Sequence, residues 1–282
     1  MLITVTSLKG GIGKTTLTLS LLKYISEGDV ERDIEPLRVI GVDCDPQGGL
    51  SFANLTGTAD SQVFDINSIP TVYEAMMDVL SGVDPVDSVV SKLCSSETLS
   101  NVSILAARPS LLGIVNDPSG NNDGADLDKA NITYGENNLL RRLLYDVSRQ
   151  YTVIVDTGTH PDIVLMAIDA ADVVVVPTIF DPHASNPVAQ TIVGSLKLGK
   201  KTVVVPWNVK GAGWENANYD SLKEGLKSIE ESLGLDSCLC LVEQPMAYSY
   251  RFRNTVSWLK AGFSPSALSA IRNLYDTIFI TE

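Results

Sequence analysis

The sequence contains few residues that could build a metal centre or a disulfide framework. It has only 4 cysteines and 2 histidines in 282 residues. The cysteines (Cys44, Cys94, Cys238 and Cys240) do not form the C-x-x-C pairs that are typical of zinc sites. Small disulfide-stapled domains are much richer in cysteine than this chain. We therefore expect buried free thiols, and neither a zinc site nor a disulfide framework.

Long hydrophobic runs are also missing. No stretch reaches the roughly 18 apolar residues that a membrane-spanning helix needs. The beginning of the chain, MLITVTSLKGG, leads directly into a strand pattern and lacks the basic segment and cleavage site of a signal peptide. These features predict a cytoplasmic protein.

Positive charge is scarce, with 21 Lys and Arg against 34 Asp and Glu and a net charge of −13. A chain this acidic repels phosphate backbones on average. Any contact with nucleic acid therefore needs a local basic patch or an assembled form.

What the sequence does contain is a regular alternation of strand and helix patterns. Six β-branched runs are apolar on both faces, as in parallel strands that are covered on both sides: LITVTS, LRVIGVD, VSILAA, TVIVDT, DVVVVPT and KTVVVPW. Stretches with helical periodicity lie between them or follow the last one, and in NNLLRRLLYDVSR the leucines form one apolar stripe. This alternation predicts an α/β fold with a doubly wound, mostly parallel sheet and helices on both faces. Residues 116–137 read as a long polar loop, and without a linker or repeat we expect residues 1–282 to form a single domain.

The stretch SLKGGIGKTTL has the features of a phosphate-binding loop. A strand, a glycine-rich turn and a helix that opens at Lys14 direct backbone N–H groups and a helix N-terminus toward phosphates. We expect Lys14 at the β- and γ-phosphates, the Thr15 hydroxyl on Mg²⁺, and Thr16 near the α-phosphate. A dinucleotide fingerprint is excluded, because Thr16 stands where its third glycine is required. The expected phosphate contacts are Gly10, Gly11, Ile12, Gly13, Lys14, Thr15 and Thr16.

Lys9 gives this loop a second lysine, and the form KGGxGKTT resembles the deviant Walker A motif of the ParA/MinD superfamily of P-loop NTPases (SIMIBI type). The resemblance implies that Lys9 crosses a dimer interface to the nucleotide of the partner, so that two protomers enclose two nucleotides. The alternative is a solvated lysine that only raises the local potential for phosphate.

Three aspartates extend the resemblance. VIGVDCDPQGG places Asp43 and Asp45 at the end of a strand, and YTVIVDTGTHP places Asp156 likewise. The resemblance implies that Asp45 orients the attacking water, that Asp43 supports the Mg²⁺ region and that Asp156 is the Walker B residue holding a magnesium-bound water. A single aspartate after a strand can also be a cap or turn residue. The family usually has prolines soon after the Walker B aspartate, whereas this chain has Thr157, Gly158, Thr159 and His160 before Pro161. His160 could approach the γ-phosphate or be an ordinary loop residue.

The resemblance also implies a base site and a DNA surface. Adenine contacts are expected from Asn208, Pro245 and Met246. Basic residues gathered by dimerisation are expected to bind DNA non-specifically, although scattered surface lysines are the alternative. The candidates are Lys197, Lys200, Lys201, Arg251, Arg253, Lys260 and Arg272.

Taken together, the motifs are typical of a ParA-like partition ATPase. This resemblance implies ATP and Mg²⁺ as cofactors, a homodimer with ATP, weak hydrolysis stimulated by a ParB-like adaptor, and a nucleoid-associated protein that segregates a plasmid, chromosome or other cargo. A MinD-like regulator on a membrane or protein scaffold is an alternative, but the end AIRNLYDTIFITE lacks a basic amphipathic anchor. A metabolic P-loop enzyme is a second alternative. An iron–sulfur reductase is not expected, because residues 157–175 contain no cysteine.

Overall fold

The computed structural model describes residues 1–55, 69–112, 135–179, 182–208, 216–234, 239–242, 246–247 and 263–280. Its strands are β1 (Leu2–Val5), β2 (Val39–Cys44), β3 (Cys94–Ser95), β4 (Val102–Leu105), β5 (Thr152–Thr157), β6 (Val173–Ile179), β7 (Lys201–Asn208), β8 (Leu239–Leu241) and β9 (Met246–Ala247). They form one sheet in the order β3-β4-β2-β5-β1-β6-β7-β8, with β9 beside β7. Only the β3–β4 pair is antiparallel. The predicted mostly parallel sheet is confirmed.

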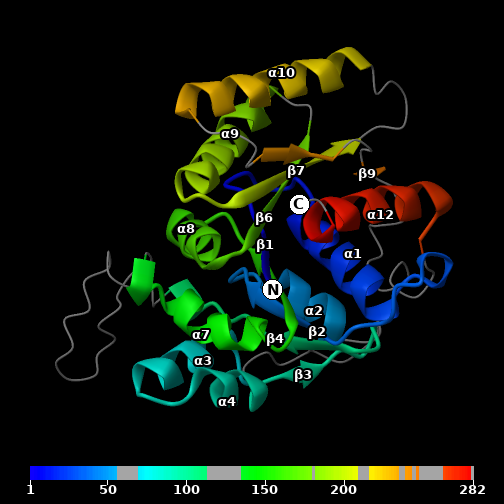
Figure 1. Cartoon of the computed structure of the whole chain (residues 1–282). Helices are drawn as coiled ribbons and strands as arrows, with labels where there is room; N and C mark the ends of the chain where they lie inside the picture. The colour runs from blue at the N-terminus through cyan, green and yellow to red at the C-terminus, as the bar shows by residue number, and fades with distance from the viewer. Residues whose placement is uncertain are drawn as a thin grey trace.

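Helices cover both faces of this sheet (Figure 1). One face carries α1 (Lys14–Glu27), α2 (Gly49–Leu55) and α12 (Pro265–Phe279). The other carries α3 (Val72–Leu80), α7 (Leu139–Ser148), α8 (Pro161–Ala170) and α9 (Pro182–Lys197), with α4 (Pro85–Val90) packed on α7 and α10 (Asn216–Leu233) near β8. Short 3-10 turns, η1 (Val30–Arg32) and η3 (Gly135–Asn137), precede β2 and α7. The doubly wound arrangement is therefore confirmed.

The local sequence explains why these elements form. The central strand β1 is buried along its whole length, as a strand covered on both faces must be. In α7 the leucine stripe is buried while Arg141 and Arg142 are exposed. The Asn138 side chain accepts a hydrogen bond from the backbone N–H of Arg141 (3.1 Å), which caps the helix. Burial of the amphipathic stripe thus holds α7 against β5.

The described helices and cysteines bear on two predictions from the sequence, that no helix spans a membrane and that the thiols are free and buried. None of the helices that the structure describes has the length and apolar character to cross a bilayer. Cys44 is a buried free thiol, as expected, whereas Cys94 and Cys240 are only half-buried. Cys238 lies outside the described residues.

The C-terminal helix α12 is fastened to the end of α1. The Tyr24 and Tyr275 rings meet edge to face with centroids 5.3 Å apart. Asp29, just after α1, accepts hydrogen bonds from Arg272 Nε (2.6 Å), Arg272 Nη2 (2.8 Å) and the Tyr24 hydroxyl (2.8 Å). Arg272 also pairs with Glu31 at 2.7 Å. The helix that begins at the glycine-rich loop is therefore anchored at its far end.

Candidate functional site

The glycine-rich loop leaves the sheet at its centre. Because β1 lies between β5 and β6, residues 6–13 emerge where the carboxyl ends of parallel strands form a ligand-binding crevice. Gly11 (φ 72°) and Gly13 (φ 87°) both have left-handed torsions that favour glycine. A Cβ at Gly13 would also lie 3.1 Å from Trp207 Cε2. The indole, buried near the end of β7, thus forms a wall against which only glycine fits.

Lys14 opens α1 and bends back over the loop. Its Nζ donates a hydrogen bond to the Lys9 carbonyl at 3.1 Å, across the glycines. Burial lowers the pKa of Lys14, while the carboxylates of Asp156 and Asp45 act in the opposite direction. A desolvated ammonium beside a glycine-rich loop suits a polyphosphate, because its several anionic oxygens can accept from both the ammonium and the loop's backbone N–H groups.

Asp156 lies directly below the first turn of α1. Its two carboxylate oxygens accept hydrogen bonds from the hydroxyls of Thr15 (2.7 Å) and Thr18 (3.1 Å). Thr18 also donates to the Lys14 carbonyl at 3.1 Å. The predicted strand-end aspartate is therefore tied to the hydroxyl that we expect to bind the metal.

Asp43 lies on the neighbouring strand, in register with Asp156. It accepts from the Asp45 N–H (3.0 Å) and from the N–H (2.8 Å) and hydroxyl (2.7 Å) of Ser51. Both carboxyls are fully buried. Burial raises the pKa of each, and the charge of Asp43 adds to the shift of Asp156. Two such carboxyls side by side favour either protons or a cation.

These groups fit a magnesium nucleotide. Within the described residues, no group of three or more His, Cys, Asp or Glu could hold a metal alone. Mg²⁺ in phosphate-binding proteins is usually held by one or two protein oxygens, substrate phosphates and waters. Thr15 would supply such an oxygen. Asp156, which accepts a hydrogen bond from Thr15, would lie close enough to hold a water bound to the metal.

Asp45 connects the segments that follow β2 and β5. Its Oδ1 accepts from the Gln47 N–H at 3.0 Å. A Cβ on Gly158 would lie only 2.9 Å from that oxygen, so the two segments touch. A Cβ on Gly10 would meet Thr159 Cγ2 at 3.8 Å, which places the second segment beside the glycine loop as well. The segments after β2 and β5 are therefore in contact, and a movement of one would displace the other.

The remaining predicted site residues fall into two groups. Lys9 is half-buried, and its side chain has no hydrogen-bond or ion-pair partner in the part of the chain that the structure describes. Asn208 ends β7 and pairs with Ala247 of β9, while Met246 pairs with Trp207, so the backbone of Met246 lies one pair away from Asn208. Pro245 lies outside the described residues. His160 precedes α8 without capping it, and its Nδ1 is buried with no hydrogen-bond partner there.

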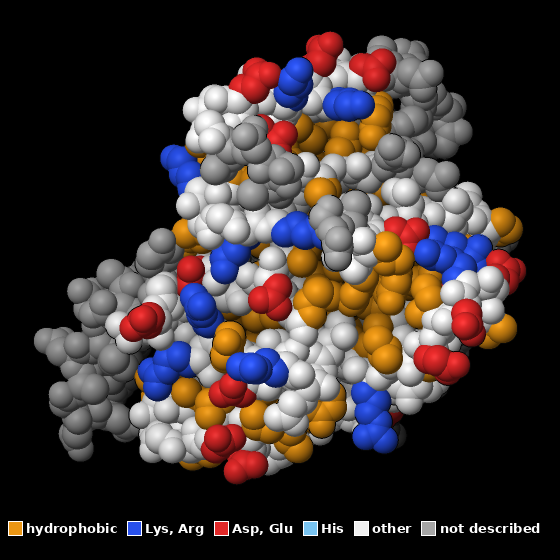
Figure 2. Space-filling model, viewed as in Figure 1, with side chains coloured by type: hydrophobic (Ala, Val, Ile, Leu, Met, Phe, Trp, Pro, Cys, Tyr) orange, Lys and Arg blue, Asp and Glu red, His pale blue; other side chains and the backbone are white. Residues whose placement is uncertain are grey.

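The predicted DNA residues are separated in space. Lys197 is exposed at the end of α9, while Lys200 and Lys201 donate to the carbonyls of Asp169 (2.7 Å) and Ile278 (3.2 Å). In Figure 2, basic side chains spread over the side of the molecule that carries α7 and α8. Arg272 is instead occupied by its pairs with Asp29 and Glu31. Arg251, Arg253 and Lys260 lie outside the described residues.

Four site residues were not identified from the sequence. Thr18 could have been found from its position four residues after Lys14, one helical turn away. Ser51, Gly158 and Trp207 reach the site only through tertiary packing. No local pattern around these three residues reveals their contacts.

Comparisons with known proteins agree with this geometry. The family described as "AAA domain" matches residues 1–203. No curated protein sequence matches the chain.

Three solved structures illustrate the similarity in fold. McdA from Cyanothece, in a complex with ATP, is 21% identical with a TM-score of 0.66, over 100% of this chain and 97% of that one. A plasmid partition protein from Borrelia burgdorferi B31 with AMPPNP is 16% identical with a TM-score of 0.65, over 98% and 97%. Cobyrinic acid a,c-diamide synthase from Mycobacterium smegmatis with ADP and magnesium is 19% identical with a TM-score of 0.63, over 99% and 95%. The chain belongs to the AAA domain family AAA_31, and its fold is that of the ParA/MinD-type P-loop ATPases.

Proposed function

We propose that the protein is an ATPase that dimerises around ATP and Mg²⁺ and positions DNA or another cargo by nucleotide-switched binding to non-specific DNA. The observation that carries the proposal is the pair of lysines on one glycine loop. Lys14 is directed across its own loop, whereas the Lys9 side chain has no partner among the described residues. The fold neighbour described as a plasmid partition protein from Borrelia burgdorferi supports the role in DNA partition, and the McdA complex supports ATP binding.

The chain's own residues divide the work of hydrolysis. The glycine loop and Lys14 would hold the phosphates, and Thr15 would hold Mg²⁺, which supplies charge neutralisation when bound. Asp45, which contacts the segment after β5, would orient the attacking water. Lys9 would stabilise charge on the partner's nucleotide, so that turnover requires two protomers.

Asp45 and Gly158 also provide the switch in this proposal. The segments around these two residues touch each other, and both lie near the loop that would contact the γ-phosphate. Loss of that phosphate on hydrolysis would release them together. A ParB-like adaptor would accelerate this step, and the change would separate the dimer from DNA.

The proposed DNA surface includes Lys197 at the end of α9 and Lys200 in the turn before β7. Lys201 is directed instead to the Ile278 carbonyl of α12, on the other face of the sheet. The cation of Arg141 and the carboxylates of Asp169 and Asp172 all lie near Lys200, so this patch is only weakly basic. One such patch is weak in a chain of net charge −13, whereas two patches in a dimer contact more phosphates. This difference would make DNA binding depend on ATP.

Binding of the purified protein to random duplex DNA tests the proposal. We expect binding with ATP and Mg²⁺, little with ADP, and retained binding in the Asp45→Ala variant because hydrolysis is blocked. Lys197→Gln should weaken binding and lower the salt dependence by about one counterion per site. Lys223→Gln, an exposed lysine on α10, is the matched control.

Two other outcomes would redirect the assignment. ATP-dependent dimerisation without DNA binding would favour a MinD-like role on a membrane or protein scaffold. A monomer with an unchanged quaternary structure in ATP would favour a metabolic enzyme, which the fold similarity to the cobyrinic acid enzyme also allows.

A further inference from the structure

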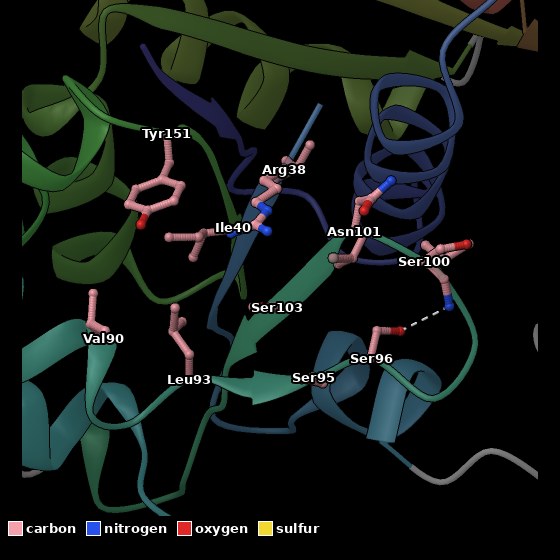
Figure 3. Close-up of a pocket in the computed structure, with 13 residues that line it drawn as sticks. Arg38, Ile40, Val90, Leu93, Ser95, Ser96, Ser100, Asn101, Ser103 and Tyr151 are labelled. Atoms are coloured by element: carbon pink, nitrogen blue, oxygen red, sulfur yellow. Dashed lines mark hydrogen bonds between the residues drawn. The ribbon is translucent and has the colours of Figure 1, made fainter. Parts of the chain in front are cut away.

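A cavity lies at the amino ends of the parallel strands, at the end of the sheet opposite the glycine loop. It has a volume of about 340 Å³ and is lined by residues around the amino ends of β2 and β4, by β3, and by the turn before β5 (Figure 3). Cavities of roughly 300 Å³ and above are large enough for a small-molecule ligand. Its position at the amino ends of the strands separates it from the nucleotide site at the carboxyl ends.

Several polar groups that line the cavity have no hydrogen-bond partner among the described residues. The guanidinium of Arg38 and the hydroxyls of Ser95, Ser100, Ser103 and Tyr151 make no hydrogen bond or ion pair within the described ranges. In Figure 3 the Arg38 side chain lies between Tyr151 and Asn101. All five groups can donate hydrogen bonds.

The charge of the lining is opposite to that of the whole protein. Arg38 is the one charged residue among those that line the cavity, and no carboxylate accompanies it. The chain as a whole carries a net charge of −13. A lone guanidinium surrounded by hydroxyl donors favours an anion, because phosphate and carboxylate oxygens can accept from all of them.

The turn between β3 and β4, which forms one wall of the cavity, is held by hydrogen bonds to α1, to α2 and within the turn. Ser96 Oγ donates to Asn54 Oδ1 (2.9 Å) and accepts from the Leu99 N–H (3.0 Å), the contact dashed in Figure 3. Asn101 Nδ2 donates to the Ser26 carbonyl at 3.2 Å. These bonds fix the backbone of the turn between β3 and β4, whereas Arg38, Ser95 and Ser100 are exposed and their side chains would become ordered only when a ligand binds.

We propose that this cavity binds a small hydroxylated anion, a sugar-sized molecule with a phosphate or carboxylate group. Arg38 pairs with the anion, and the serine and tyrosine hydroxyls hydrogen-bond to the rest of the molecule. The apolar side chains of Ile40 and Leu93 contact its carbon skeleton. The proposal does not depend on the function assigned to the nucleotide site.

Isothermal titration of the full chain with ribose 5-phosphate, gluconate and ribose tests the proposal. All titrations contain saturating ADP and Mg²⁺, so that the glycine loop cannot bind the added anion. We expect dissociation constants in the range of about 0.1–5 mM for at least one of the two anions. Ribose should bind at least about 10-fold more weakly, because it lacks the charge that Arg38 recognises.

Variants distinguish this cavity from general attraction to lysines and arginines. Arg38→Gln should weaken binding of the anion by about 10-fold or more, and Ser103→Ala by a few-fold. Lys223→Gln removes an equal charge from α10 and should change nothing. The proposal is overturned if neither anion binds at about 10 mM, if ribose binds equally well, or if Arg38→Gln binds like the wild type.

Discussion

At the scale of single residues, the two lysines of the loop should separate nucleotide binding from turnover. Lys14→Gln removes the cation that spans the glycines, and should lower affinity for Mg-ATP by about 100-fold or more, since several charge-assisted bonds are lost. Lys9→Gln should leave affinity within about 3-fold, because its side chain has no partner in the described chain, a loss of under about 1 kcal/mol. Fluorescent-nucleotide titration measures binding, and sedimentation with ATP measures dimerisation. A Lys9→Gln variant with full turnover would contradict the role in trans.

Two glycines of the same loop allow strain and steric contact to be separated. Gly11 and Gly13 both have positive φ, but only Gly13 has a neighbour where a Cβ would lie. Gly11→Ala should lower the free energy of unfolding by about 1 kcal/mol, the torsional cost alone. Gly13→Ala should cost more, because the methyl group must also displace the buried Trp207. Urea unfolding measures both, and equal losses would show that the indole moves aside freely.

At the scale of elements, Asp29 should determine how firmly α12 is held on α1. Its hydrogen bonds from Arg272 lower the pKa of Asp29 below the usual aspartate range. Asp29→Asn should lower the free energy of unfolding by about 1–3 kcal/mol. Glu31→Gln, whose side chain is 76% exposed, is the control and should cost under about 1 kcal/mol.

The lowered pKa of Asp29 predicts that the contribution of this residue to the free energy of unfolding depends on pH. Because the native pKa is lowered, its stabilisation is full above the usual aspartate range near 3.9 and disappears as pH falls through the native pKa. The difference in unfolding free energy between wild type and Asp29→Asn should therefore shrink between about pH 4 and pH 2. A difference that stays constant with pH would mean that packing, and not the ion pair, holds the helix.

The elements that sequence reasoning identified are those with strong local patterns. β1, β5 and β6 are buried on both faces and are therefore mostly apolar, with β-branched residues in succession. Helix α9 was missed, because it contains Pro187, and an interior proline usually ends a helix. The edge strands β3, β8 and β9 have only 2 or 3 residues each, too few to show any period.

The candidate site also contains both parts that local sequence patterns predict and parts that they do not. Glycines, lysine and threonine in one loop act through adjacent positions in the chain, so their spacing predicts their roles. The contacts of Ser51 with Asp43 and of Trp207 with Gly13 depend on how helices and strands pack. Such contacts leave no mark in the local sequence.

At the scale of the whole molecule, the buried pair Asp43 and Asp156 should make the nucleotide-free protein less stable as pH rises. A raised native pKa means that the folded state binds more protons than the unfolded state above about pH 4. Asp156→Asn should remove part of this slope and raise stability at neutral pH in the presence of EDTA. Asp146→Asn makes the same substitution at an exposed residue on α7 and is the control. Urea unfolding at several pH values measures the slope, and identical slopes for both variants would show that overall charge repulsion dominates.

The central position of β1 affects how the protein folds during its synthesis on the ribosome. Leu2 pairs with Val153, and Ile3 with Val173, so the first strand to be synthesised waits for partners about 150 residues later. At translation speeds of roughly 5–20 residues per second, that delay is about 8–30 s, during which a mostly apolar segment has no strand beside it. The glycine loop can take its final shape only after this pairing. The nascent chain therefore cannot hold its nucleotide until more than half of it has left the exit tunnel, and chaperones have that interval in which to shield its first strand.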